Sequence, residues 1–367
     1  MKIESIILRQ VELPLIKPYY LSFYTFESFI PIYVEVRDAD GRVGLGEAQI
    51  SPNAYVETRD SGLQFCKEMA EKVLGMDTAE AKSTIHAVWE ESALAATAFM
   101  SALEMLEDSP ILRTDKDIEI PLLTPLNSKD PAGIKEEVEQ RIGEGFRTIK
   151  VKVGSTVEDD LARVVAAQRA NAGRASLRID ANFAYSREEG CQFASSLDPD
   201  SIEHFEQPCD PEAWDDNKAV ADVSTVPIML DESIKTEEHI ETAGSLGNIA
   251  ACKLKLKRLG TVENLVKNLK RISALGMRPV LGDGTASEIG CWMEACAWRG
   301  TVDNAGEFSG FLKPKFRTLK NPLPFKDGSI HLPAGYRPEL DEDVVAKHTL
   351  AEERIGPATV SLKGAAE

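Results

Sequence analysis

The sequence predicts an α/β protein whose main part is a closed (β/α)8 barrel of the TIM type, preceded by an α+β capping domain. Three observations support this fold class. The 367 residues exceed the usual size of a single domain. Before about residue 118 a group of predicted strands precedes a group of predicted helices, whereas beyond it short strands and helices alternate one by one. Beyond that point, charged residues recur at nearly constant intervals where apolar runs end.

The first hundred residues have the pattern of a small α+β domain. Apolar and polar positions alternate in residues 3–15 and 30–36, and a DADG turn leads into a third run, which predicts a three-stranded antiparallel meander. Residues 55–106 contain long helix-forming stretches with Gly and Asp at their ends. Strands followed by helices are typical of an α+β fold.

Beyond residue 118, eight short apolar runs alternate with helical segments. Alternation of this kind predicts a parallel sheet, and eight units favour a closed barrel over an open sheet. The runs are IPLLTPL, FRTIKVKVG, ASLRIDAN, SIEHFEQP, VPIMLDES, ACKLKLKRLG, RPVLGDG and NAGEFSG.

Charged residues mark the ends of five consecutive runs. Lys152, Asp180, Glu206, Asp231 and Lys255 follow one another at intervals of 28, 26, 25 and 24 residues. One strand and its crossover helix fit into each interval, so these side chains should emerge from the same end of five neighbouring strands. In a barrel, that end carries the active site.

The chain should therefore divide into three parts. We expect a capping domain at residues 1–112 and a barrel at 113–315. Residues 316–367 are too many for a simple terminus, and we expect them to pack back on the capping domain.

The composition excludes several classes of function. A net charge of -18 argues against a nucleic-acid partner, because phosphate backbones are bound by clustered Lys and Arg. Apolar runs fall short of the roughly 20 residues that span a bilayer, so no membrane role is implied. Six scattered cysteines without a CxxC pair, and a start that lacks a signal-peptide pattern, predict reduced thiols and a cytoplasmic protein.

Three carboxylates point to a metal site. Asp180, Glu206 and Asp231 follow consecutive predicted strands, in the motifs DAN, EQP and DES. Mg²⁺ prefers oxygen ligands and keeps positions open for water or substrate. Any one of these residues alone could be a loop charge or a helix cap, but three in succession at this spacing favour a single metal site.

Lysines on two strands supply the second part of the site. Lys150 and Lys152 alternate with Val151, so both point to one face of their strand. In a barrel interior, mutual repulsion, desolvation and a nearby metal should lower the pKa of one of them and provide a base near neutral pH. The alternative is an edge strand with two solvated lysines. The alternation recurs in CKLKLKR at 252–258, where a solvated run of charges is an equally good interpretation.

These motifs together make the chain resemble the enolase superfamily, and within it the muconate-lactonizing-enzyme-like subgroup, over nearly its whole length. The resemblance implies a modified, enolase-like barrel beneath an N-terminal capping domain. The mandelate-racemase-like subgroup uses a histidine on the seventh strand, but no histidine lies between His239 and His331. The landmarks are GLGEA at 44–48, KVK at 150–152, DAN at 180–182, EQP at 206–208, DES at 231–233 and KLKRLG at 255–260.

The resemblance implies roles for these residues. Lys152 and Lys255 would be the acid/base pair on opposite faces of the substrate. Lys150 would tune Lys152 or hold the substrate carboxylate. For Glu307, on the predicted eighth strand, two roles are open: contact with an ammonium group of an amino-acid-like substrate, or a structural partner within the protein. Further residues near the substrate would be Asn182 and Asp283. The ligands of one Mg²⁺ per subunit would be Asp180, Glu206 and Asp231.

The implied reaction is removal of the proton alpha to a carboxylate. This step leads to racemisation or epimerisation of a proline or hydroxyproline derivative, an N-acyl amino acid or a dipeptide. Where the beta carbon carries a leaving group, the same step leads to dehydration. The alternatives are a cycloisomerase of the muconate-lactonizing type, a Schiff-base lysine aldolase that needs no such metal site, and a non-catalytic relative. We expect a homo-oligomer acting on a small-molecule carboxylate.

Some stretches depart from the family pattern, so the substrate does not carry over. The seventh strand continues into GDGTASEIG, Thr261 replaces a glycine, and residues 334–343 read AGYRPELDED. Residues 15–30 correspond to the family's lid loop and are rich in aromatics, which would exclude water or contact a ring or a cation. The alternative is that they pack the seam between domains. They are Tyr19, Tyr20, Phe23, Tyr24 and Phe26.

Overall fold

The computed structural model describes residues 1–20, 24–52 and 57–357. They form two compact units. The first comprises Met1–Pro110, Pro314–Phe316 and the described part of Asp341–Glu367, and the second comprises Ile111–Lys313 and Arg317–Leu340.

The first unit is built on a four-stranded antiparallel sheet in the order β16-β1-β4-β5. The meander expected from the sequence is present as β1, β4 and β5, but the segment between β1 and β4 forms a hairpin of its own, and a strand from late in the chain joins the edge of the sheet. The sheet strands are β1 (Ile3–Val11), β4 (Ile32–Asp38), β5 (Val43–Ala48) and β16 (Thr349–Ile355), and the hairpin strands are β2 (Leu13–Tyr20) and β3 (Thr25–Phe29).

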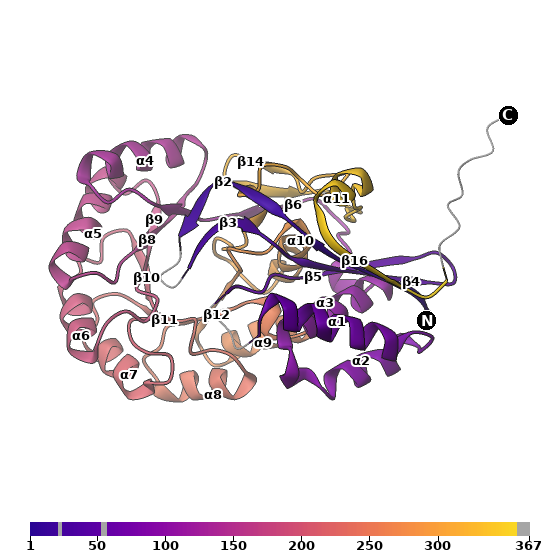
Figure 1. The fold of residues 1–367 in the computed structure, drawn as a ribbon. Coiled ribbons are helices and arrows are strands. Elements are labelled where there is room, and N and C mark those ends of the chain that lie inside the picture. The colour runs from indigo at the N-terminus through magenta and orange to yellow at the C-terminus, as the bar shows by residue number, and fades with distance from the viewer. Residues whose placement is uncertain (21–23, 53–56, 358–367) are drawn as a thin grey trace. The chain divides into compact units, whose positions relative to one another are not determined.

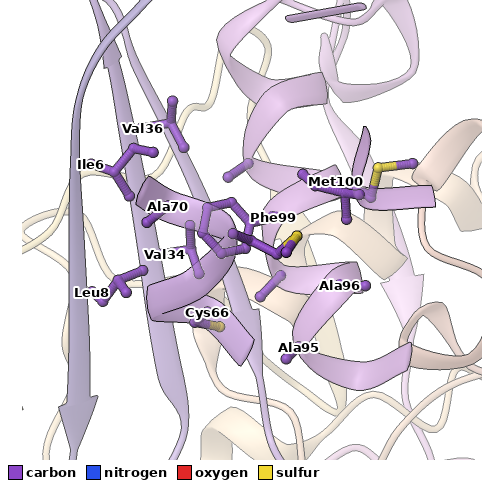
Figure 2. Close-up of a cluster of buried hydrophobic side chains, with 14 of the residues drawn as sticks. Ile6, Leu8, Val34, Val36, Cys66, Ala70, Ala95, Ala96, Phe99 and Met100 are labelled. Carbon is purple, nitrogen blue, oxygen red and sulfur yellow. The ribbon is translucent and has the colours of Figure 1, made fainter. Parts of the chain in front are cut away.

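Helices cover one face of this sheet and bury its apolar side chains. They are α1 (Arg59–Val73), α2 (Thr78–His86) and α3 (Ala93–Leu106), while α11 (Glu342–His348) precedes β16. Phe99 of α3 is fully buried and extends toward the strands (Figure 2). Around it Figure 2 labels Ile6, Leu8, Val34 and Val36 of the sheet, Cys66 and Ala70 of α1, and Ala95, Ala96 and Met100 of α3.

Two glycines allow α3 to lie directly on β5. A Cβ atom on Gly44 would stand 2.0 Å from the carbonyl oxygen of Ala102, and one on Gly46 would stand 1.9 Å from that of Ala98. The backbone of the strand and the backbone of the helix are therefore in contact, and only glycine fits. This accounts physically for both glycines of GLGEA.

The second unit contains seven parallel strands in the order β7-β8-β9-β10-β11-β12-β13, each followed by a helix. In Figure 1, α4 to α8 lie along the outside of the curled sheet. The strands are β7 (Thr124–Leu126), β8 (Thr148–Lys152), β9 (Ser176–Asp180), β10 (Ile202–Glu206), β11 (Ile228–Leu230), β12 (Ala251–Leu254) and β13 (Arg278–Leu281). The helices are α4 (Pro131–Gly143), α5 (Val157–Asn171), α6 (Arg187–Ser196), α7 (Trp214–Val223), α8 (Glu237–Leu246), α9 (Val262–Ala274) and α10 (Glu288–Trp298).

A short segment fills the eighth position and closes the sheet into a barrel. The amide of Glu307 donates to the carbonyl of Leu281 at the end of β13 (2.9 Å). On its other side, the amide of Gly306 donates to Pro121 (2.8 Å), and Gly306 accepts from the amide of Leu123 (3.0 Å). The predicted (β/α)8 barrel with a separate N-terminal α+β unit is confirmed, with its eighth strand reduced to this segment.

The remaining elements are short. A three-stranded antiparallel sheet in the second unit has the order β14-β15-β6, with bounds Phe325–Lys326, Ser329–Leu332 and Ile118–Pro121. Single turns of 3-10 helix occupy Trp89–Glu91, Pro110–Leu112, Leu256–Arg258 and Gly310–Leu312. All six cysteines are free thiols. Among the described residues, none of the helices has the length and apolarity that crossing a membrane requires.

Replacing Gly46 by alanine should separate α3 from β5. Because the new methyl group would meet backbone atoms that cannot rotate away, we expect the free energy of unfolding to fall by about 3 kcal/mol. Urea unfolding followed by circular dichroism measures this. The control is Gly143→Ala in α4, where a Cβ would meet nothing within 4 Å and the change should stay within about 0.5 kcal/mol. Equal effects of the two substitutions would refute the backbone contact.

Candidate active site

The strand register places three of the predicted site residues side by side. Lys152 on β8 pairs with Asp180 on β9, and Asp180 pairs with Glu206 on β10. Asp231 directly follows β11, and Lys255 directly follows β12. All five side chains therefore start from the carboxyl ends of neighbouring strands, as their sequence intervals predict.

Glu206 also belongs to a ring of four charged side chains inside the barrel, which we call the charged ring: Lys150, Glu206, Lys253 and Glu307. They come from the second, fourth, sixth and eighth positions of the barrel, the arrangement of one interior layer. Lys150 contacts Glu206 (2.8 Å) and Glu307, and Lys253 contacts the same two carboxylates, with 3.1 Å to Glu307. Each lysine therefore touches both acids, so the charges alternate around the barrel.

The buried lysines of the charged ring are held as ammonium ions. Burial alone would lower the pKa of Lys150, but the carboxylates of Asp180, Glu206 and Glu307 outweigh it and raise that pKa above its usual range. The pKa of Lys253 is raised in the same way. Lys150 is therefore not the lysine with a lowered pKa that the sequence pattern leads one to expect.

The outer lysines, Lys152 and Lys255, are more accessible. Their side chains are 32% and 16% exposed, against 5% for Lys150 and 2% for Lys253. Lys152 contacts Asp180 at 2.5 Å, and Lys255 contacts Asp231 at 2.8 Å. A molecule entering the carboxyl end of the barrel would meet these two amines before it met the ring.

Asp231 is the most heavily neutralised carboxylate of the site. Lys253 lies 2.6 Å, Lys255 2.8 Å and Arg258 2.9 Å from its oxygens. Burial would raise its pKa, but the three cations hold it well below the usual range. Lys253 and Arg258 have this role without having been singled out from the sequence, although Lys253 shares the strand face of Lys255.

Gln207 of the EQP motif fixes the backbone that carries Asp231. Its side-chain oxygen accepts hydrogen bonds from the amides of Asp231 (2.9 Å) and Ser233 (3.2 Å), and its amide nitrogen donates to the hydroxyl of Ser233 (2.8 Å). Gln207 itself has a φ of +39°, a conformation that few non-glycine residues adopt. Its side chain links the end of β10 to the residues that follow β11, a contact that motif spacing alone does not reveal.

The carboxylates fit a divalent cation. One oxygen each from Glu206, Asp231 and Glu232 lie within 4.8 Å of one another. The Oε2 atom of Glu232 is buried and accepts no hydrogen bond, as a ligand atom would. Asp180, the remaining member of the predicted trio, instead directs Oδ2 at Lys150 (2.9 Å) and Lys152. Glu232 directly follows Asp231 in DES, and this adjacency was the available signal for it.

Asn182 joins Lys152 to the carboxylates. Its Oδ1 accepts from the Lys152 ammonium, its Nδ2 donates to Glu232 (3.0 Å), and its backbone amide donates to Asp180 (2.8 Å). The predicted auxiliary position of Asn182 is therefore within hydrogen-bonding reach of the site.

The other two auxiliary residues have protein partners of their own. Glu307 is shared by Lys150 and Lys253, so a substrate ammonium group would have to compete with two lysines for it. Asp283 lies two residues beyond the end of β13 and contacts Lys257 (2.7 Å) and the hydroxyl of Thr285 (2.8 Å).

Glu294 on α10 braces two strand ends. Its carboxylate accepts from the amide of Leu256, just after β12, and from the amide of Asp283, just after β13, both at 3.0 Å. Burial and the nearby charge of Asp283 raise its pKa to about 8. Because Leu256 is adjacent to Lys255, the brace helps fix the strand end that carries that lysine.

The aromatic segment predicted to act as a lid is the hairpin β2–β3 of the first unit. Phe26 lies at its centre, with ring centroids 6.4 Å from Tyr19, 4.8 Å from Tyr24 and 5.3 Å from Phe29. Tyr20 is exposed, and Phe23 lies outside the described residues. The rings pack on one another within the hairpin, and the lid role stays a prediction.

The chain resembles known proteins both in sequence and in fold. A family model described as enolase C-terminal domain-like matches residues 133–343. Muconate cycloisomerase 1-2 of Acinetobacter lwoffii is 26% identical over 364 residues and 91% of each chain. N-succinyl-L-Arg/Lys racemase of Bacillus cereus is 23% identical over 97% of this chain and 100% of its own. A dipeptide epimerase structure from Cytophaga hutchinsonii, complexed with Mg and D-Ala-L-Val, has a TM-score of 0.88 at 22% identity, over 97% of this chain and 100% of that one.

Glu294 should make the stability of the protein depend on pH. Its pKa of about 8 in the folded state exceeds the value of about 4.3 in an unfolded chain, so the folded protein binds more protons between these values. The resulting stability is fully present below the unfolded pKa and is lost as the pH rises through the folded one. We expect the free energy of unfolding to fall between about pH 5 and pH 8, by at most about 1.4 kcal/mol per pH unit.

Urea unfolding over this pH range tests the effect in wild type and in Glu294→Gln. The variant should be less stable at low pH, since its amide cannot accept from both backbone donors, but its stability should change less with pH. Exposed Glu136→Gln on α4 serves as the control and should follow wild type. Parallel curves for wild type and Glu294→Gln would show that Glu294 is not the group responsible.

Proposed function

Because this chain belongs to the enolase superfamily, we propose that it is a Mg²⁺-dependent isomerase that racemises or epimerises an amino-acid derivative. The bond broken would be the C–H bond alpha to the substrate carboxylate. The observation that carries the proposal is the pair of accessible lysines, Lys152 and Lys255, each in contact with a carboxylate at the carboxyl end of the barrel.

The topology supports a mechanism with two bases. Lys152 ends the second strand of the barrel and Lys255 follows the sixth, and these positions lie opposite each other in a ring of eight. A planar carbanion held between them would present one face to each amine. One lysine removes the alpha proton as a neutral amine, and the other returns a proton as an ammonium ion on the opposite face, which inverts the stereocentre.

The alpha proton is weakly acidic, so most of the acceleration must come from electrostatic stabilisation of the carbanion. A bound Mg²⁺ would supply it by neutralising the charge that develops on the substrate carboxylate. We propose Asp180, Glu206 and Asp231 as the ligands. Neighbouring cations lower the pKa values of Asp180 and Asp231 despite burial, and metal ligands must be ionised. Burial raises the pKa of Glu206 to about 7 and raises that of Glu232 as well, so either carboxylate would give up a proton when it binds the cation.

The chemistry of the relatives guides the choice of substrate. The similar proteins are named for N-succinyl amino acids, dipeptides and muconate. We favour an amino-acid derivative, because inversion uses two opposed bases, whereas cycloisomerisation needs one. Dehydration would use the same first step on a substrate with a leaving group at the beta carbon.

Proton exchange at the alpha carbon tests the lysine pair. We expect NMR in D₂O with Mg²⁺ to show exchange for one class among proline derivatives, N-acyl amino acids and dipeptides. Lys152→Ala and Lys255→Ala should each slow racemisation by about 10²-fold or more, while each retains exchange of the enantiomer whose proton faces the remaining lysine. Exposed Lys267→Ala on α9 should match wild type.

The pattern of loss separates the candidates. Loss of activity with Lys152→Ala but not Lys255→Ala would indicate one-base chemistry of the cycloisomerase type. Activity that survives both substitutions would refute the assignment of the bases. Activity that persists after metal removal, together with borohydride trapping of a lysine, would point to a Schiff-base aldolase.

Magnesium titration tests the ligand set. Asp180→Asn and Asp231→Asn should each weaken Mg²⁺ binding by about tenfold or more in calorimetry, and Mg²⁺ should raise the melting temperature of wild type by mass action. Glu232→Gln should weaken binding less than Asp180→Asn. The reverse order would make Glu232 the third ligand, and exposed Glu212→Gln is the matched control.

A further inference from the structure

A cavity that is widely open to solvent lies at the opposite end of the barrel from the lysine pair. It has a volume of about 570 Å³, within the range of about 300–1,000 Å³ typical of small-molecule sites. The residues that begin β8, β9, β10 and β13 all line it: Thr148, Ser176, Ile202 and Arg278. The carboxyl ends of the same strands carry Lys152, Asp180 and Glu206, so the two sites lie at opposite ends of the strands.

Arginines are the main charged residues that line this cavity. They are Arg147, Arg174 and Arg278, together with the carboxylate of Glu203. Arg174 pairs with Glu139 (2.6 Å), and Arg278 pairs with Glu203 (2.8 Å) and Asp303 (3.2 Å). Among the described residues, Arg147 is therefore the lining arginine that has no carboxylate partner, and it is open to an anionic ligand.

The one carboxylate of the lining is already neutralised. Glu203 accepts from Arg178 Nε (3.0 Å) and Nη2 (3.1 Å) and from Arg278 Nη1 (2.8 Å). Arg178 is fully buried and also donates from Nη2 to Asn304 (2.9 Å), another lining residue. Its Nη1 atom is buried and has no hydrogen-bond partner. Two guanidinium groups therefore surround one carboxylate.

Arg147 offers a guanidinium group to an incoming anion. It donates Nη1 to the carbonyls of Ile142 (3.1 Å) and Phe146 (2.8 Å), and no carboxylate of the described residues forms an ion pair with it. Its remaining N–H groups are exposed at the rim. The hydroxyls of Ser176 and Ser201 lie on the same lining, where they already contact Thr148 (3.0 Å) and Asp200 (3.4 Å).

We propose that this cavity binds a small organic anion through a phosphate or carboxylate group, with Arg147 as its principal contact. The planar fork of a guanidinium group matches both kinds of oxyanion through paired hydrogen bonds. The volume exceeds that of a lone oxyanion, so the ligand has room for a carbon skeleton. The site is independent of the proposed isomerase function, because none of its lining residues belongs to the lysine pair or to the proposed Mg²⁺ ligands.

Calorimetry on the full chain with Mg²⁺ tests this proposal with three probes: inorganic phosphate, glycerol 3-phosphate and succinate. We expect at least one to bind with one site per chain, and the affinity of Arg147→Ala to fall about tenfold or more. Arg147→Gln, which keeps a donor for the two carbonyls, should also bind weakly. Exposed Arg187→Ala on α6 should bind as wild type does. Tighter binding of the phosphate probes or of succinate identifies the oxyanion.

Three outcomes would overturn the proposal. In the first, none of the probes binds at millimolar concentration. In the second, binding is unchanged in both Arg147 variants. In the third, binding is lost in Lys152→Ala and kept in Arg147→Ala, which would place the anion at the carboxyl end of the barrel. Because Lys152→Ala reports on that end and Arg147→Ala on this one, failure here is distinguishable from failure of the isomerase proposal.

Discussion

The structure depends on a buried ring of alternating charges. Lys150, Glu206, Lys253 and Glu307 form one interior layer from alternate strands, a layer that bulky apolar side chains usually fill in such barrels. Removing one member would leave an uncompensated buried charge, at a cost of about 3–5 kcal/mol. Glu307 lies in the segment that closes the barrel, so closure of the fold and assembly of the site rely on the same interactions.

Residues two apart on a β-strand point to the same face, and in this site each such pair joins a structural lysine to one available for chemistry. The more exposed lysine follows the buried one by two residues: Lys152 follows Lys150, and Lys255 follows Lys253. The inner member fixes its strand in the charged ring, and the outer member is held by one neighbouring carboxylate. Because the charged ring fixes the strand, the outer amine is oriented yet accessible, which suits a group that moves protons.

The sequence alone predicts the fold class and the positions of the strand-end residues, because both follow from periodicity and from the length of a βα unit. It does not reveal contacts across the barrel. Glu294 reaches a backbone amide 38 residues away, and no spacing rule predicts such a brace. The raised pKa of Lys150 has the same origin, since it depends on carboxylates from three other strand positions. The eighth strand was predicted from an apolar run, yet in the described part of the chain its ladder contacts come from Gly306 and Glu307.

The edge strand β16 has a consequence for synthesis on the ribosome. Ile6 of β1 pairs with Ile355 of β16, and Arg9 contacts Glu342 and Glu352. The first unit cannot complete its sheet until Thr349–Ile355 have emerged, whereas every strand of the barrel precedes them in the chain. Since contacts between distant residues form slowly, β1 must wait with an unpaired edge while the barrel is translated, and residues 341–357 complete the first unit last.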